Sequence, residues 1–455
     1  MSPRWTLGEI AVLLAGELRN DAVDRPCNGV ATDSRQLQPG ELFVALQGEH
    51  FDGHDFLATA QQKGALAALV SHPVALDLPQ IVVADTLHAY GQLAAAWRRR
   101  FSLPLIAVTG SNGKTTVKEM LAAILGQQGP VLATQGNFNN EVGVPRTLLG
   151  LEEQHVAAVI EEGASHPGDI AYLTGIVQPT VALVTNAAGA HLQGFGSLQV
   201  VAETKGEIFA HLPAGGVAVI NADDEFAPLW RQLADGHPVW RFSLDPASDA
   251  EVRGELRDDG SLLIHSPAGE VEVRLPLEGR HNAMNALAAT AAALAAGAEL
   301  AEVKTGLEAM RPVPGRLQRK PGVRGATIID DTYNANPASL QAALAVLARA
   351  RGERYLAMGD MAELGEQAVE LHQQAGRQAR QAGVQRLYAV GECSRHAAQA
   401  FGEHGEHFAA QGELIARLQD DLHDNVTLLV KGSRAAHMED VVAALSAPVV
   451  AGGAG

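Results

Sequence analysis

The stretch PLIAVTGSNGKTTVK occupies residues 104–118 and decides the fold of the surrounding chain. Residues 105–109 are apolar or small and include two β-branched side chains, which predicts a buried strand of a parallel sheet. Gly110 and Gly113 can adopt backbone conformations that a Cβ disfavours, so that successive N–H groups can turn inward around an anion. The stretch therefore predicts an α/β fold that carries a phosphate-binding loop.

The side chains after the second glycine support this prediction. Lys114 adds a mobile positive charge, and Thr115 and Thr116 open a helix whose N-terminal dipole favours phosphate. A hydroxyl at this position can bind the Mg²⁺ that accompanies a nucleoside triphosphate. The usual P-loop has glycine where this chain has Val108, so the loop is a shortened variant, and the alternative is an ordinary strand–turn–helix connection. The residues expected to bind ATP here are Thr109, Gly110, Ser111, Asn112, Gly113, Lys114, Thr115 and Thr116.

Length, charge and cysteine content restrict the classes of protein that fit this chain. A chain of 455 residues is long enough for about three domains. Its formal charge of −18 argues against a nucleic-acid partner, because phosphate backbones need clustered lysine and arginine. Cys27 and Cys393 are the only cysteines, which excludes a disulfide framework and a cysteine metal cluster. The chain has no signal-peptide pattern and no run of about 18 apolar residues, so we expect no membrane insertion. The cysteine usage favours a reducing cytoplasm, and we expect a monomer.

The predicted elements divide the chain into three domains. Residues 1–85 form a small α/β domain, residues 86–312 a central domain with a parallel sheet, and residues 313–455 a second domain with a parallel sheet. The elements behind this division are a helix at 6–18, strands at 41–46, 67–70, 80–83, 105–109, 156–160, 181–185, 216–220, 326–329, 354–358, 386–390 and 427–430, and β-hairpins at 241–276.

Polar side chains follow several of the predicted strands. Glu161 places a carboxylate at the end of one strand, and His191 follows the next, at the edge where ligands of open α/β sheets bind. His191 is either a surface residue or a metal ligand. Lys205 lies in a predicted helix, and composition alone favours a solvated charge there.

Further candidate ligand contacts lie at a helix start and in loops. His281 and Asn285 are four residues apart and Asn282 and Asn285 are three apart, so they share a helix face that can hydrogen-bond a purine. Ser34 and Arg35 either bind a phosphorylated ligand or form an ordinary turn. The other candidates are Asn137 and Asn140 in an amide-rich loop, and Asp331, Asn334, Asn336, Lys431, Ser433 and Arg434 after strands of the third domain.

Together these pieces resemble the Mur ligases, the ATP-dependent amide-bond-forming enzymes of peptidoglycan synthesis. The resemblance implies a UDP-substrate domain, a central P-loop-type ATPase domain and a C-terminal Rossmann-like domain. It is closest to the branch that adds D-alanyl-D-alanine, and the DNPR signature of the diaminopimelate-adding branch is absent. The motifs that carry it are TDSR (32–35), DGHDF (52–56), TGSNGKTT (109–116), GNFNNEVGVP (136–145), GRHNAMN (279–285), PGR (314–316), DDTYNANP (330–337), GDMAELGE (359–366) and KGSRAAHMED (431–440).

The resemblance also implies a reaction and roles for the candidate residues. ATP would phosphorylate the terminal carboxylate of UDP-N-acetylmuramoyl-tripeptide, and the amine of D-alanyl-D-alanine would attack the acyl phosphate. Lys114 would hold phosphates, Thr115 and Glu161 would position one Mg²⁺, and His191 and a carbamylated Lys205 would serve a second. Nucleotide contacts would also come from His281, Asn282, Asn285, Arg316 and Asp331, and substrate contacts from Ser34, Arg35, Asn137, Asn140, Asn334, Asn336, Lys431, Ser433 and Arg434.

Three other classes compete with this interpretation. A folylpolyglutamate synthase shares the ligase core, but the TDSR and DGHDF elements resemble a UDP-sugar module. A P-loop kinase or regulatory NTPase has no evident use for a second α/β domain, and a non-catalytic scaffold fits less well still. No single side chain specifies whether the tripeptide ends in diaminopimelate or lysine.

Overall fold

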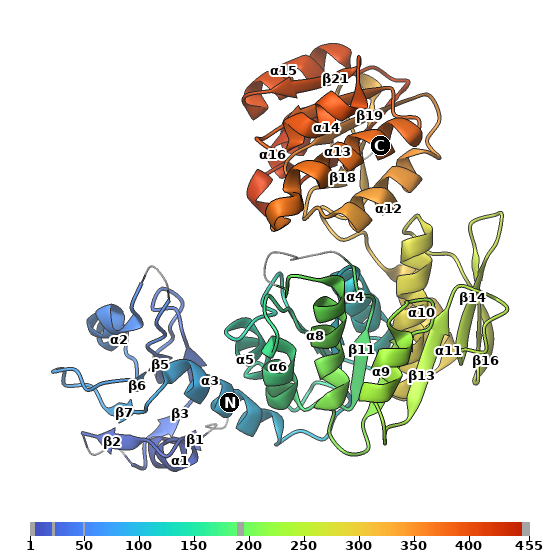
Figure 1. The fold of residues 1–455 in the computed structure, drawn as a ribbon. Helices are drawn as coiled ribbons and strands as arrows, with labels where there is room; N and C mark the ends of the chain where they lie inside the picture. The colour runs from blue at the N-terminus through green and yellow to red at the C-terminus, as the bar shows by residue number, and fades with distance from the viewer. Residues whose placement is uncertain (1–4, 21–22, 49–50, 189–194, 448–455) are drawn as a thin grey trace, which may run out of the picture.

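The computed structural model describes residues 5–20, 23–48, 51–188 and 195–447. Figure 1 shows three α/β bodies along the chain: an N-terminal one in blue, a central one in green and yellow, and a C-terminal one in orange and red. The predicted α/β class with parallel sheets is confirmed. Within these ranges, no helix has the length and apolar character needed to cross a bilayer.

The N-terminal body contains a mostly parallel sheet of five strands in the order β2-β7-β6-β5-β4, with β2 antiparallel at one edge. β1 and β3 form a separate two-stranded ribbon. The strands are β1 (Trp5–Thr6), β2 (Glu17–Arg19), β3 (Pro26–Cys27), β4 (Gly29–Ala31), β5 (Glu41–Val44), β6 (Ala67–Val70) and β7 (Gln80–Val82), and the helices are α1 (Leu7–Leu13), η1 (Gly53–Phe56) and α2 (Leu57–Gln62).

The first predicted helix, 6–18, is too long at its C-terminal end. Thr6 caps its start through a reciprocal pair of hydrogen bonds with Glu9, but the helix ends at Leu13. Ala15 then adopts a left-handed conformation (φ 49°), and the next residues form β2 against β7. The sequence pattern suggested a longer helix because Leu18 also fits the apolar spacing of a helix. In the structure, Leu18 lies in β2 opposite Ile81.

The central body is organised around β8, the strand of residues 105–109, whose five residues are all buried. It lies between β10 and β11 in a sheet of nine strands, in the order β16-β15-β14-β13-β12-β11-β8-β10-β9. The strands from β9 to β14 are parallel, and β15 and β16 continue as antiparallel hairpins. The strands are β8 (Leu105–Thr109), β9 (Val131–Ala133), β10 (Ala157–Glu161), β11 (Val181–Val184), β12 (Val217–Asn221), β13 (Val239–Ser243), β14 (Val252–Leu256), β15 (Leu262–Ser266) and β16 (Gly269–Val273).

Alternate residues of β8 face two different hydrophobic cores. Leu105 and Ala107 belong to a core with α3, α5, α6, α8 and α9, and Ile106 and Val108 belong to a core with α4, α10 and α11. The first core continues into the N-terminal body, so the two bodies share one apolar interior. The helices are α3 (Thr86–Arg98), α4 (Lys114–Leu125), α5 (Gly143–Leu148), α6 (Asp169–Val177), α8 (Leu198–Ala210), α9 (Ala227–Leu233), α10 (Arg280–Ala295) and α11 (Leu300–Ala309).

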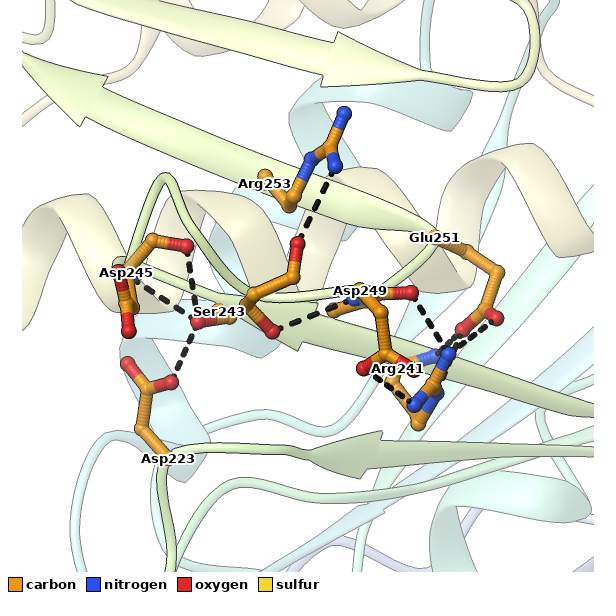
Figure 2. Close-up of polar contacts among 9 residues, drawn as sticks. Asp223, Arg241, Ser243, Asp245, Asp249, Glu251 and Arg253 are labelled. Atoms are coloured by element: carbon orange, nitrogen blue, oxygen red, sulfur yellow. Dashed lines mark hydrogen bonds and ion pairs between the residues drawn. The ribbon is translucent and has the colours of Figure 1, made fainter.

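The prediction of β-hairpins at 241–276 is correct for β14–β16 but wrong for the first strand, because β13 pairs in parallel with β12. Figure 2 shows the polar contacts that fix the β13–β14 connection. Arg241 of β13 forms ion pairs with Asp249 (Nη1–Oδ1, 2.8 Å) and Glu251 (Nη2–Oε1, 2.8 Å). Ser243 donates a hydrogen bond to Asp223, beyond β12. The hairpins therefore extend the central sheet rather than form a separate layer.

The C-terminal body has a six-stranded sheet in the order β17-β18-β22-β19-β20-β21, with only β17 antiparallel. Hydrophobic cores lie on both faces of this sheet. Its strands are β17 (Gln318–Pro321), β18 (Thr327–Asp331), β19 (Glu353–Met358), β20 (Arg386–Val390), β21 (Gly405–Phe408) and β22 (Val426–Lys431), and its helices are η2 (Val323–Gly325), α12 (Pro337–Leu347), η3 (Gly365–Gln367), α13 (Ala368–Gln381), α14 (Ser394–Phe401), α15 (Gln411–Asp421), η4 (Arg434–Ala436) and α16 (Glu439–Leu445).

His372 links α13 to the segment after β19 and makes the stability of this body depend on pH. Its Nδ1 lies 2.7 Å from Ala368 O and Nε2 accepts from Met361 N at 3.0 Å, so the ring is neutral. Burial lowers the pKa of His372, so the unfolded chain binds a proton first as pH falls. The contribution of His372 to the free energy of unfolding is therefore fully present above a pH of about 6.5. It decreases below this pH, by at most about 1.4 kcal/mol per pH unit.

We expect His372→Gln, which keeps a donor and an acceptor but cannot be protonated, to weaken this dependence. Urea unfolding of both proteins at pH 7.5 and pH 5.5 measures it. The wild type should lose more free energy of unfolding between these pH values than the variant, and equal losses would contradict the assignment.

Candidate active site

The loop between β8 and α4 has the geometry of a phosphate-binding loop. Gly110 and Gly113 have φ values of 139° and 85°, and Gly113 caps the N-terminus of α4. A Cβ at Gly110 would overlap Thr185 Oγ1, and one at Gly113 would overlap Asn285 Oδ1, so both positions need glycine. The helix starts at Lys114, one residue before Thr115, so the N-terminal end of the helix dipole lies directly at the loop.

The end of β11 holds this loop in place. Thr185 Oγ1 and Asn186 Nδ2 both donate to Asn112 O, at 2.7 and 3.0 Å, and Asn186 Oδ1 accepts from Asn112 N at 3.1 Å. Ser111 Oγ donates to Ala188 O at 3.0 Å. The loop backbone is therefore preorganised by its neighbour in the sheet, so little conformational freedom remains to be lost when an anion binds.

Lys114 provides the cation of the loop. Its Nζ donates to Gly110 O at 2.6 Å, which keeps the ammonium group within the loop. Removal from water lowers the pKa of Lys114; Arg316 contributes in the same direction, whereas Glu161 opposes the shift. Two positive side chains converge here in a chain of net charge −18, which is the electrostatic arrangement that a polyphosphate needs.

Glu161, at the end of β10, meets the loop at Thr115. Thr115 Oγ1 donates to Glu161 Oε2 at 2.9 Å, and Asn139 Nδ2 donates to Glu161 Oε1 at 2.9 Å. A hydroxyl and a carboxylate side by side are a suitable donor set for Mg²⁺, which keeps several waters and binds substrate phosphates with one or two carboxylates. Among residues 5–20, 23–48, 51–188 and 195–447, no cluster of three or more His, Cys, Asp or Glu side chains could hold a metal by itself. His191 lies outside the described residues.

Lys205 is buried in α8 and faces the same region, which contradicts a solvated lysine. Only 2 % of the residue is exposed, and its Nζ lies 5.6 Å from the centroid of the Phe195 ring. Burial, with a smaller contribution from Lys114, lowers the pKa of Lys205 to about 7. The neighbouring carboxyl of Glu162 accepts from Thr174 Oγ1, and burial raises its pKa to about 8. The amine of Lys205 is thus held in an environment that favours its neutral form.

Two residues of the C-terminal body contact the loop. Arg316 Nη2 donates to Thr115 Oγ1 at 2.9 Å while its guanidinium lies over the Tyr333 ring, 4.2 Å from the centroid. Asn336 Nδ2 donates to Asn112 Oδ1 at 2.8 Å. The facing surfaces enclose a cleft of about 810 Å³, which we call the interdomain cleft. Predicted site residues that line it are Gly110, Ser111, Asn112, Gly113, Lys114, Thr115, Thr116, Asn140, Glu161, Lys205, His281, Asn282, Asn285, Arg316, Asp331, Asn334, Asn336 and Lys431.

The first turns of α10 form one wall of the interdomain cleft. Asn285 Nδ2 donates to Asn282 Oδ1 at 3.3 Å, which orients both amides, and burial lowers the pKa of His281. On the opposite wall, Lys431 Nζ is paired with Asp331 Oδ2 at 2.5 Å. Asn285 Oδ1 lies close to Gly113, so these neutral hydrogen-bonding groups adjoin the phosphate-binding loop, and charged side chains of Lys114, Arg316 and Lys431 line the same cleft.

Other predicted site residues lie away from the interdomain cleft. Thr109 is buried at the end of β8, where its hydroxyl donates to Glu162 O, and Asn137 is exposed in the amide-rich loop. Arg35 is paired with Asp33 on the N-terminal body, with Ser34 beside it. Ser433 is buried and Arg434 is paired with Glu439.

Some cleft residues were missed by the sequence reasoning. Ser165, His166 and Asp169 line the cleft after β10. A signal for these three was available, because they lie in the connection between β10, which ends at Glu161, and α6, which begins at Asp169. Tyr333 was a candidate from its place in the DDTYNANP motif after a predicted strand, and it lines the cleft from the C-terminal body. Its stacking with Arg316 is a contact between side chains that no local pattern predicts.

Comparisons with known proteins agree with this geometry. Three family models match in order: "Mur ligase family, catalytic domain" at residues 26–98, "Mur ligase middle domain" at 108–293 and "Mur ligase, glutamate ligase domain" at 315–434. The UDP-N-acetylmuramoyl-tripeptide--D-alanyl-D-alanine ligase of Escherichia coli strain K12 is 47% identical over 445 residues, covering 97% of this chain and 98% of that protein.

Solved structures show the same relationship. MurF from Acinetobacter baumannii has a TM-score of 0.91 at 38% identity, covering 97% of this chain and 99% of that one. MurF from Thermotoga maritima in complex with ADP has a TM-score of 0.79 at 28% identity, covering 91% and 96%.

A folylpolyglutamate synthase from Mycobacterium tuberculosis is more distant. It has a TM-score of 0.62 at 19% identity and covers 79% of this chain and 94% of that one, a likeness of fold alone. From the matched domain models, the near-complete coverage by the E. coli ligase and the geometry of the interdomain cleft, it follows that this chain belongs to the Mur ligase family.

Proposed function

We propose that this chain is the ATP-dependent ligase that joins D-alanyl-D-alanine to UDP-N-acetylmuramoyl-tripeptide, giving the pentapeptide, ADP and phosphate. The observation that carries the proposal is the interdomain cleft, where the phosphate-binding loop of the central body meets Arg316 and Lys431 of the C-terminal body. Similarity over nearly the whole chain to ligases of that name supports the choice of substrates.

The residues of the cleft suit the first chemical step, phosphorylation of the tripeptide carboxylate by ATP. The backbone amides of the loop, Lys114 and Arg316 hold the phosphates and withdraw charge from the oxygens. Thr115 and Glu161 would hold Mg²⁺, which supplies positive charge beside the transferring phosphoryl group. The neutral amides of Asn282 and Asn285, on the wall of the cleft beside Gly113, can hydrogen-bond the base.

The second step replaces phosphate by an amine. The acyl phosphate contains a good leaving group, so the amine of D-alanyl-D-alanine attacks the carbonyl carbon, loses a proton, and phosphate departs as the amide forms. Negative charge accumulates near two anions during this step, and the convergent cations stabilise it. Because the cleft lies between two bodies, their closure would exclude water that would otherwise hydrolyse the acyl phosphate.

The remaining assignments concern substrate contacts and cellular context. The N-terminal body would hold the UDP portion through Ser34 and Arg35, and Asn140, Asn334 and Lys431 would face the peptide portions. Asn137, Asn336, Ser433 and Arg434 complete the assigned substrate contacts, and His191 is assigned to the second Mg²⁺. We also assign the protein to the cytoplasm, in accord with its cysteine content and its apolar pattern, and we assign a monomer.

We expect phosphate release from Mg·ATP to require both UDP-N-acetylmuramoyl-tripeptide and D-alanyl-D-alanine. Omission of either substrate should reduce release to background, because the acyl phosphate is formed on one and consumed by the other. The assay measures inorganic phosphate and weighs the product formed from each of the two tripeptides, with diaminopimelate or lysine as third residue. Activity with folate and glutamate instead would favour the folylpolyglutamate alternative, and phosphate transfer without any amine would favour a kinase.

A further inference from the structure

Arg146, on the short helix α5, contacts both the N-terminal body and the amide-rich loop beside Glu161. Its Nη2 donates to Gln36 Oε1 at 3.1 Å, and its guanidinium carbon lies 4.4 Å from the centroid of the Phe138 ring. Figure 1 shows α5 on the side of the central body that faces the N-terminal body. One planar side chain therefore stacks on an aromatic ring and donates to an amide at the same time, which a lysine cannot do.

The loop that contains Phe138 is fitted closely around the carboxylate of Glu161. The side-chain Nδ2 of the next residue, Asn139, donates to Glu161 Oε1 at 2.9 Å. The backbone oxygen of Asn139 accepts from Gly163 N at 2.7 Å. Gly163 has no room for a Cβ against the Asn139 side chain, and Gly143 has none against the backbone of Phe138. A displacement of Phe138 would thus be transmitted to Asn139, and through it to Glu161.

The Gln36 side of the contact belongs to the segment that carries Ser34 and Arg35. Arg35 holds the pKa of Asp33 below its usual range, and the positive charge of Arg146 makes a smaller contribution. Gln36, Arg146, Phe138, Asn139 and Glu161 form a continuous series of contacts from the N-terminal body to Thr115 of the phosphate loop.

We propose that Arg146 is a positioning residue that couples the N-terminal body to Glu161, so that a UDP-linked substrate seated on residues 32–36 aligns the Mg²⁺-binding carboxylate. This inference rests on the proposed function, because it assumes that the N-terminal body holds the UDP portion. Arg146 is exposed and its contacts are few, so its substitution should disturb the coupling without disturbing the core that the two bodies share.

Arg146→Met tests the coupling, because methionine keeps an unbranched side chain but has neither charge nor a planar fork. We expect about a fivefold lower kcat and about a fivefold higher Mg²⁺ concentration both for half-maximal rate and for half-maximal ATP binding measured by calorimetry, with KM for D-alanyl-D-alanine unchanged. Arg146→Lys should restore little of the loss. Arg231→Met, at an exposed arginine of α9, is the matched control and should behave as wild type.

A double-mutant cycle with Gln36→Leu distinguishes coupling from two independent effects. If the two residues act through one contact, the double variant should be no worse than Arg146→Met. Additive losses, or wild-type kcat and Mg²⁺ dependence in Arg146→Met, would overturn the coupling while leaving the proposed function intact. A wild-type protein that binds Mg·ATP by calorimetry but does not ligate the two substrates would instead overturn the proposed function.

Discussion

Lys114→Ala is expected to abolish ATP-dependent ligation, lowering the rate by a factor of about 10³ or more. The lysine is the cation closest to the phosphate-binding loop in sequence and structure, and its Nζ lies 2.6 Å from Gly110 O within the loop. Without it, the loop amides and Arg316 would remain, but no mobile ammonium could follow the charge that moves to the leaving oxygens.

The variant should keep its fold, because the loop conformation depends on other contacts. Asn112 is bonded to Thr185 and Asn186, and Ser111 Oγ donates to Ala188 O, so these contacts remain when the bond from Lys114 Nζ to Gly110 O is lost. Phosphate release with all substrates present measures activity, and thermal unfolding measures the fold. Lys304→Ala, at a partly exposed lysine of α11, is the matched control. Turnover near the wild-type rate in well-folded Lys114→Ala would refute the phosphate assignment.

Lys205→Met is expected to lose ligation almost completely, by at least about 10²-fold, if the lysine acts as a carbamate ligand of Mg²⁺. Formation of a carbamate needs a neutral amine that attacks CO₂, and burial lowers the pKa of Lys205 to about 7. The amine is therefore mostly neutral above pH 7 and mostly charged below it, so carbamylation of the wild type should increase as pH rises through 7. Methionine preserves an apolar contact with Phe195 but cannot react with CO₂.

Rescue experiments separate a lost carbamate from a lost side chain. Bicarbonate should not restore Lys205→Met, whereas formate or acetate should restore part of the activity by placing a carboxylate at the vacant position. The Lys304→Ala protein again serves as the control, since it should respond to neither addition. Wild-type rates in Lys205→Met, together with an experimental structure of the wild type that shows an unmodified lysine, would remove Lys205 from the mechanism.

Local sequence signals were sufficient for the centre of the fold. The buried run of β8, the two glycines and the start of α4 follow from short-range sterics and from apolar patterning, and each is where it was predicted to within two residues. The length of the first helix was not predictable in this way, because Leu18 satisfies a helical spacing and also a strand position opposite Ile81. Pairing with β7 decided between them.

The sequence by itself determined the chemistry of the loop. The polar residues that follow predicted strands also indicated which side chains could contact a ligand. Only the tertiary structure decided that Arg316 and Asn336, 201 and 224 residues beyond their partners in the loop, face it across the interdomain cleft. It also decided that Lys205 is buried rather than solvated. The physical reason is that backbone conformation and apolar periodicity are local, whereas burial, pKa and contacts between domains depend on how separate cores pack together.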